Sequence, residues 1–127
     1  MLYHDGYDDF QNLEATVETI VANLRERIDE FESIVVTGIS GQCVGFPVAL
    51  ALGKTILVLR KMDDTSHGIP GQLLNAKVVT EGDRVLFLDD FIGAGGTIKR
   101  CREAVEKLGA EIIARYMYRD HLWSPCG

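Results

Sequence analysis

The feature that most constrains the fold is segment 85–97, an apolar run that ends in two carboxylates and a glycine-rich turn. In order it reads Val85, Leu86, Phe87, Leu88, Asp89, Asp90, Phe91, Ile92, Gly93, Ala94, Gly95, Gly96 and Thr97. Such apolar runs are typical of buried parallel strands, and open α/β sheets bind ligands at the carboxyl ends of their strands. Glycines let the backbone approach an anion, and the N–H groups opening the next helix attract phosphate. The segment therefore predicts a strand, a phosphate-binding turn and a helix.

The two carboxylates narrow the choice of ligand. Asp89 and Asp90 would repel a bare phosphate, but they suit neutral hydroxyl groups or a magnesium ion beside the phosphate. A phosphorylated sugar meets this requirement. A strand, turn and helix without a ligand is the alternative interpretation, and it leaves the acid pair unexplained.

Length and composition indicate one soluble globular domain over residues 1–127, with 46% apolar and 25% charged residues. A net charge of −6 argues against nucleic-acid binding by phosphate neutralisation. The apolar runs are too short to span a bilayer, and the first residues do not have the pattern of a signal peptide. The three cysteines are odd in number and widely spaced, which favours a reducing compartment and hence the cytoplasm.

Hydrophobic periodicity predicts alternating helices and strands. The expected helices are 12–32, 45–52 and 97–108, and the expected strands are 33–39, 55–59, 77–80, 84–89 and 111–118. Residues 62–76 lack periodicity and are expected to form a loop. The alternation predicts a three-layer α/β fold with a mainly parallel central sheet.

Segment 85–97 resembles the phosphoribosyl-pyrophosphate motif of type I phosphoribosyltransferases, an apolar strand followed by two acids and a loop ending in Gly-Gly-Thr. A second segment, 45–53, is similar to the family's Gly-x-Pro-x-Ala-x-Ala-x-Gly helix, and the strand after it ends in Arg60 and Lys61 as in the family. Together the two anchors cover about residues 34–118. The resemblance implies the family's core with a reduced hood, because only residues 1–11 and 119–127 remain for one.

The resemblance also implies site residues. Asp89 and Asp90 would hold the ribose hydroxyls and help to place magnesium, and Arg60 and Lys61 would neutralise the leaving pyrophosphate. The alternative for Arg60 and Lys61 is a charge pair in solvent. The 5′-phosphate would be bound by Gly93, Ala94, Gly95, Gly96 and Thr97, and the pyrophosphate loop would contain Ser40, Gly41 and Gln42.

The implied function is transfer of phosphoribose from phosphoribosyl pyrophosphate to a nucleobase, with magnesium, by a homodimer. Three departures from the family favour an alternative, a non-catalytic module that binds phosphoribosyl pyrophosphate or a nucleotide. The expected pyrophosphate loop 39–43 has no Lys or Arg, segment 62–76 is short for a mobile catalytic loop, and little chain remains for a hood. The motif also has Ala94 where the family usually has Thr or Ser. The sequence does not name the base.

Two further features have open interpretations. Segment 63–68 either closes over the site, with His67 on the pyrophosphate, or is an ordinary polar loop. Trp123 either stacks on a base or packs against the first helix, and packing is the favoured interpretation.

Overall fold

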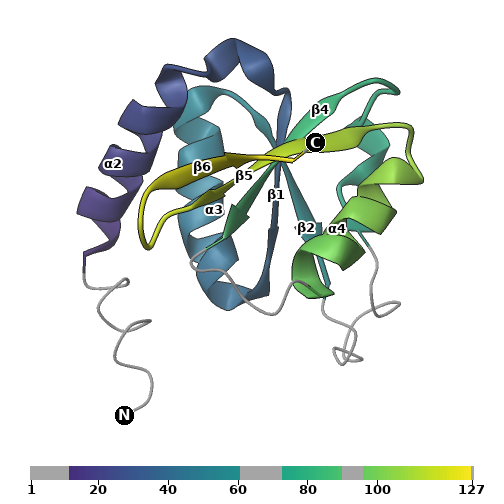
Figure 1. Cartoon of the computed structure of the whole chain (residues 1–127). Coiled ribbons are helices and arrows are strands. Elements are labelled where there is room, and N and C mark those ends of the chain that lie inside the picture. Colours follow the sequence, from purple (N-terminus) through teal and green to yellow (C-terminus); the bar gives the residue numbers. More distant parts are fainter. Residues whose placement is uncertain (1–11, 61–72, 90–95, 127) are drawn as a thin grey trace.

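A six-stranded sheet in the order β3-β2-β1-β4-β5-β6 forms the centre of this computed structural model (Figure 1), which describes residues 12–60, 73–89 and 96–126. Neighbours from β2 to β5 are parallel, and the edge strands β3 and β6 are antiparallel to theirs. The strands are β1 (Ser33–Thr37), β2 (Thr55–Leu59), β3 (Leu73–Leu74), β4 (Arg84–Asp89), β5 (Glu111–Met117) and β6 (Leu122–Pro125). The expected mainly parallel α/β sheet is confirmed.

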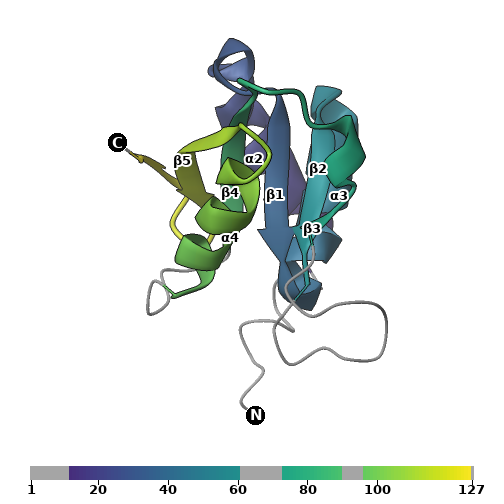
Figure 2. The same ribbon diagram turned by 90° about the vertical axis from the view of Figure 1, so that its right-hand side faces the viewer.

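Helices cover both faces of the sheet. Helices α2 (Leu13–Arg25) and α3 (Gly38–Leu52) lie on one face, and α4 (Gly96–Glu106) lies on the other, as Figure 2 shows from the side of α4. Successive side chains of β1 alternate between the two cores, with Ile34 and Val36 on the α3 face and Val35 on the α4 face. Both faces are buried, and for this reason the central strands are continuous apolar runs rather than alternating ones.

Helix α3 approaches the sheet closely because of Gly45. A Cβ atom at this position would lie 2.7 Å from Val36 Cγ1, closer than real Cβ contacts, and 3.1 Å from Ile56 Cδ1, tighter than most of them. The absent side chain therefore lets the helix backbone lie directly on β1 and β2. This close approach brings the middle of α3 against Val36 of β1 and Ile56 of β2.

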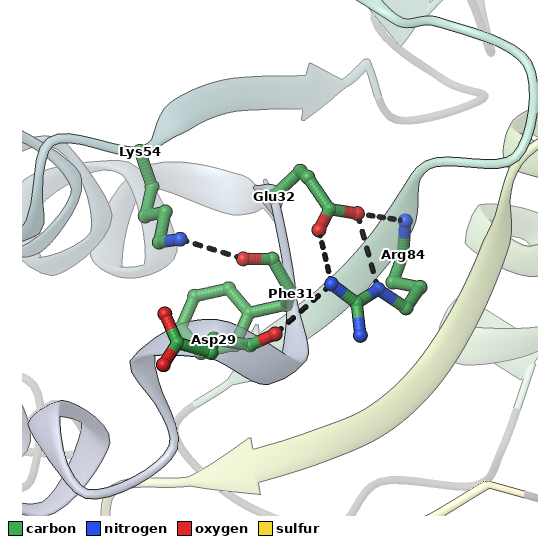
Figure 3. A network of polar contacts seen from close by, with 5 residues as sticks. All are labelled: Asp29, Phe31, Glu32, Lys54 and Arg84. Atoms are coloured by element: carbon green, nitrogen blue, oxygen red, sulfur yellow. Dashed lines mark hydrogen bonds and ion pairs between the residues drawn. The ribbon is translucent and has the colours of Figure 1, made fainter.

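A polar network joins the segments at the amino ends of the strands (Figure 3). The Glu32 carboxylate accepts hydrogen bonds from the Arg84 backbone N–H, at 2.7 Å, and from the Arg84 guanidinium. Arg84 Nη2 also donates to the carbonyl oxygen of Asp29 at 2.9 Å, and Lys54 Nζ donates to that of Phe31 at 2.7 Å. These contacts stabilise the end of the sheet at which the parallel strands begin, opposite to their carboxyl ends.

Several expected boundaries were wrong. The first helix ends at Arg25, and a separate 3-10 turn, η1 (Ile28–Glu30), precedes β1. The expected strand 77–80 is largely a second 3-10 turn, η2 (Ala76–Val78). The edge strands β3 and β6 were not predicted, because each is only two to four residues long and is defined by pairing with a distant strand.

Candidate functional site

The order in which the chain adds strands to the sheet reverses between β1 and β4. From β1 the chain passes through α3 to β2 on one side, whereas β4 leads through α4 to β5 on the other side. Since α3 and α4 cover opposite faces, their connections separate at the carboxyl ends of β1 and β4. In open α/β sheets this switch point is where ligands bind.

Two helices begin after the strands that form the switch point. Helix α3 begins at Gly38 directly after β1, and α4 begins at Gly96, seven residues after β4 ends at Asp89. Gly38 has φ +75°, a conformation that favours glycine, so the chain turns from strand to helix within one residue. Thr37, the residue before α3, does not cap the helix with its side chain. The first N–H groups of α3 therefore need other acceptors, and an anion is a suitable one.

Asp89 is the last residue of β4 and is half-buried. Its carbonyl oxygen accepts a hydrogen bond of 2.9 Å from the Tyr118 N–H. Strands β1 and β4 pair up to Val35 and Phe87. Continuing this register by two residues places Asp89 beside Thr37, directly before α3. Asp89 therefore lies where the sequence predicts it, at the carboxyl edge of the sheet, whereas Asp90 lies outside the described residues.

Arg60 follows β2 at the same edge and is only 8% exposed. Beside it, Thr37 Oγ1 donates a hydrogen bond of 2.9 Å to the carbonyl oxygen of Leu59, which ties the ends of β1 and β2 together. The alternative that Arg60 is a solvent-exposed strand-end charge is wrong, because a guanidinium so deeply buried requires polar or anionic partners. Its partner in the expected pair, Lys61, lies outside the described residues.

The expected loop conformation of residues 39–43 was wrong, because Ser40, Gly41 and Gln42 lie in α3. Their expected role at the pyrophosphate stays a prediction. The glycine-rich composition suggested a loop, but the turn needs only Gly38, and the helix continues from there through Pro47 to Leu52. Ser40 is half-buried in the first turn, where N–H groups lack partners within the helix. Gly41 and Gln42 lie further along, where N–H groups bond within the helix. An anion at this site would therefore meet the helix N-terminus.

The remaining predicted residues divide into two groups. Gly96 and Thr97 form the start of α4, in agreement with the predicted helix N-terminus. Gly93, Ala94 and Gly95 lie outside the described residues, as does His67. The site that the structure assembles thus consists of Asp89, Arg60 and the beginnings of α3 and α4.

The part of the chain that the structure describes contains no cluster of three or more His, Cys, Asp or Glu side chains able to hold a metal. Magnesium in phosphate-binding enzymes is usually held by one or two carboxylates together with substrate phosphates and water. The Asp89 carboxylate at the mouth of an anion site fits this type of coordination. Asp89 alone is not expected to hold a metal ion when no substrate is bound.

A hydrogen-bonded group centred on Tyr116 was missed at the sequence level. Asn23 Nδ2 of α2 donates to the Tyr116 hydroxyl at 2.8 Å, and that hydroxyl lies 2.6 Å from His121 Nδ1 in the turn between β5 and β6. Burial raises the pKa of Tyr116 above its usual value, partly offset by the hydrogen bond from Asn23. The group ties α2 to the turn after β5. No local pattern predicts it, because Asn23 and Tyr116 are 93 residues apart in sequence.

Trp123 on β6 packs within the fold. Its ring lies 6.4 Å from that of Phe31, centroid to centroid, and the Arg27 guanidinium lies 4.4 Å from its ring centroid. The favoured interpretation, packing against the first helix, is confirmed only in that Trp123 packs within the fold. Arg27 and Phe31 belong to the expected helix 12–32, but both lie beyond the end of α2 at Arg25, and Phe31 follows η1. Trp123 belongs to the α2 face of the sheet.

Known proteins resemble the chain in sequence and fold. HGPRTase-like protein 3 of Haloterrigena turkmenica is 35% identical over 112 residues, covering 78% of this chain and 59% of the relative. Adenine phosphoribosyltransferase of Clostridium novyi is 28% identical over 118 residues, covering 84% and 67% respectively. The solved adenine phosphoribosyltransferase of Thermoanaerobacter pseudethanolicus matches with a TM-score of 0.69 at 24% identity, over 87% of this chain and 69% of that one.

The chain thus spans about three fifths to two thirds of the length of these two curated relatives. No protein-family profile matches it. Among the described helices, none has the length and apolar character needed to cross a membrane. The structural match shows the fold, and the curated relatives connect that fold to one family.

Proposed function

Because the chain belongs to the type I phosphoribosyltransferase family, we propose that it transfers phosphoribose from phosphoribosyl pyrophosphate to a nucleobase and releases pyrophosphate. The observation that carries this proposal is the placement of Asp89 between two helix N-termini at the switch point of the sheet. This arrangement offers a ribose-binding carboxylate flanked by two anion sites. Phosphoribosyl pyrophosphate has this layout, with a phosphate on one side of the ribose and a pyrophosphate on the other.

Each part has a distinct proposed role. The start of α4, at Gly96 and Thr97 with the preceding residues 93–95, binds the 5′-phosphate. The start of α3, at Gly38 to Ser40, binds the pyrophosphate. Helix N-termini bind anions through N–H groups and the helix dipole, so α3 needs no cation of its own for this role.

The protein contributes mainly positioning and electrostatic stabilisation. Breaking the bond between ribose and pyrophosphate leaves positive charge on the ribose and negative charge on the leaving group. Asp89 and Asp90 hold the ribose hydroxyls on the positive side, and Arg60 and Lys61 balance the pyrophosphate on the other. Magnesium would be held by substrate oxygens and, indirectly through ribose hydroxyls or water, by Asp89 and Asp90, and it would further neutralise the pyrophosphate.

The names of the relatives make adenine the first base to test. We also propose that the protein works as a homodimer in the cytoplasm, on the family resemblance and on its cysteine usage. Nucleic acid is not proposed as a partner, in view of the net charge of −6. A membrane is not proposed, because the apolar runs are too short to span one.

The test is pyrophosphate release from phosphoribosyl pyrophosphate and magnesium with a panel of bases. We expect release with at least one purine, and a large loss of rate in Asp89→Asn. Asp29→Asn is the matched control, because Asp29 lies at the opposite edge of the sheet and uses its backbone oxygen there. If phosphoribosyl pyrophosphate binds but no base causes pyrophosphate to be released, the enzyme proposal is wrong and the non-catalytic binding module takes its place.

A further inference from the structure

The end of β4, which carries Asp89, is paired with β5 but not with β1 in the part of the chain that the structure describes. The ladder between β1 and β4 stops at Phe87. The ladder between β4 and β5 continues to Asp89, which pairs with Met117. One residue further along β5, the Tyr118 N–H donates its hydrogen bond of 2.9 Å to the Asp89 carbonyl oxygen. The position of Asp89 therefore depends on the end of β5.

A turn of four residues, 118–121, follows β5 directly and leads into β6 (Figure 1). Its last residue, His121, has φ +50°, a left-handed conformation that is uncommon in residues other than glycine. Such a backbone persists only where surrounding contacts hold it, and it occurs preferentially at functional sites. The turn therefore needs a contact that offsets the strain at His121.

The contact that closes the turn joins His121 to Tyr116. Nδ1 of His121 lies 2.6 Å from the Tyr116 hydroxyl oxygen, and the two ring centroids are 5.9 Å apart. The same hydroxyl accepts a hydrogen bond of 2.8 Å from Asn23, so its own proton is available to His121 Nδ1. Tyr116 is only 2% exposed. The turn is thus closed onto a side chain that the core and α2 hold in place.

We propose that His121 is a positioning residue for Asp89. By closing the turn onto Tyr116, His121 fixes the end of β5. Through the Tyr118 N–H, the end of β5 then fixes the last residue of β4. This role rests on the proposed function, in which the Asp89 carboxylate holds a ribose hydroxyl.

His121 acts on the backbone of Asp89 rather than on its carboxylate. Tyr116 packs on the face of the sheet that α2 and α3 cover, whereas Phe87 packs on the α4 face. Side chains alternate along a strand, so Asp89, two residues after Phe87, points towards the α4 face as well. In agreement, burial raises the pKa of Cys101 in α4 to about 12, and the Asp89 carboxylate adds to the rise. The two groups lie on opposite faces, and the backbone of β5 connects them.

The first experiment measures amide hydrogen exchange by NMR and needs no substrate. His121→Gly accepts the left-handed backbone but lacks the ring. We expect its Tyr118 amide to exchange about threefold to tenfold faster than in wild type, since one hydrogen bond that closes the turn is lost. The amide of Val35, in the buried centre of β1, is the reference for global unfolding and should not change.

Two further variants separate the hydrogen bond from other effects on the turn. His121→Asn should retain the protection of Tyr118, because asparagine tolerates a left-handed backbone and carries an amide near the place of Nδ1. Asp120→Asn is the matched control, at an exposed residue of the same turn. We expect wild-type exchange at Tyr118 in both variants.

The second experiment compares two ligands by titration calorimetry with magnesium. His121→Gly should bind phosphoribosyl pyrophosphate about threefold to tenfold more weakly than wild type, because Asp89 is less well placed for the ribose. Its affinity for inorganic pyrophosphate, which has no ribose, should not change. His121→Asn should bind both ligands as wild type does. A merely structural role of His121 would not separate the two ligands in this way.

Three outcomes would overturn the proposal. Unchanged exchange of Tyr118 in His121→Gly would show that the ring does not hold the turn. Faster exchange of Val35 to the same extent would give His121 a general role in stability. Faster exchange of Tyr118 alone, with unchanged affinity for phosphoribosyl pyrophosphate, would show that the turn does not position Asp89. If wild type does not bind phosphoribosyl pyrophosphate, the proposed function fails, and the exchange experiment still decides whether His121 fixes the end of β5.

Discussion

Thr37 Oγ1 donates a hydrogen bond of 2.9 Å to the carbonyl oxygen of Leu59, across the carboxyl ends of β1 and β2. The bond joins the residue before α3 to the residue before Arg60. The Thr37 side chain therefore reinforces the pairing of the strand ends that lead into two parts of the candidate site, the helix N-terminus and the buried Arg60. Because the Thr37 hydroxyl is used in this way, Thr37 makes no side-chain capping hydrogen bond to α3.

Thr37→Val should disturb the site more than the fold. The substitution keeps the branched shape and removes one hydrogen bond, worth about 0.5–1.5 kcal/mol of the free energy of unfolding. We expect a weaker affinity for phosphoribosyl pyrophosphate as well, since the hydroxyl no longer reinforces the pairing of Thr37 with Leu59 beside α3 and Arg60. Thr37→Ser, which keeps the hydroxyl, should restore binding. Denaturant unfolding and titration calorimetry measure the two effects, and equal affinity in Thr37→Val and wild type would contradict the positioning role.

Arg60→Lys should impair turnover although the charge is retained. Lysine cannot reproduce the planar set of donors of a guanidinium. We expect a fall in kcat/KM of about tenfold or more, consistent with loss of a charge-assisted hydrogen bond of roughly 1.5–3 kcal/mol. Arg25→Lys, at an exposed arginine of α2 far from the switch point, is the control. Steady-state kinetics with varied phosphoribosyl pyrophosphate measures both variants, and full activity of Arg60→Lys would remove Arg60 from the site.

Gly45→Ala should destabilise the protein. The new Cβ atom would lie 2.7 Å from Val36 Cγ1 and would force α3 away from the sheet. Overpacking of this kind costs about 1–3 kcal/mol. Gly41→Ala in the same helix is the control, because its Cβ would make only an ordinary contact of 3.5 Å with Val36. Chemical denaturation of both variants tests the difference, and Val36→Ala should partly rescue Gly45→Ala.

Glu32→Gln should weaken the dependence of stability on acid pH. The hydrogen bond from the Arg84 side chain, followed by that from its backbone, holds the pKa of Glu32 below its usual value of 4.5. A carboxyl with a lowered pKa contributes stability that is present above pH 4.5 and is lost as pH falls towards the folded-state pKa. Unfolding of wild type between pH 7 and pH 3 should show this loss, and Glu32→Gln should show less of it. Glu30→Gln, in a separate exposed pair with Arg27, serves as the control.

Tyr116→Phe should uncouple α2 from the turn after β5. Because burial raises the pKa of Tyr116, its contribution to stability is present below about pH 10 and is lost as pH rises further. We expect Tyr116→Phe to cost about 0.5–1.5 kcal/mol near neutral pH and to reduce the alkaline loss. A double-mutant cycle with Asn23→Ala should give a coupling energy, and strict additivity would show that the 2.8 Å contact contributes nothing.

Local patterns were sufficient for the centre of this fold. Strands 55–59 and 84–89 were predicted with the boundaries that the structure has, because an apolar run buried on both faces is visible in the sequence alone. The same logic placed Asp89 at a strand end and Thr97 at the start of a helix. The sequence thereby determined the class of fold and one half of the candidate site.

Tertiary structure decided what depends on distant partners. Ser40 lies in a helix rather than a loop because Gly38 has a positive φ and Gly45 packs against Val36. The number of glycines in this segment reveals neither feature. The edge strands β3 and β6 exist because they pair with β2 and β5. The burial of Arg60 and the contact of Asn23 with Tyr116 arise only when the sheet brings distant segments together. Hydrophobic periodicity indicates which side of a helix or strand is buried. It does not indicate which other segment covers that side, because this depends on how the whole chain folds.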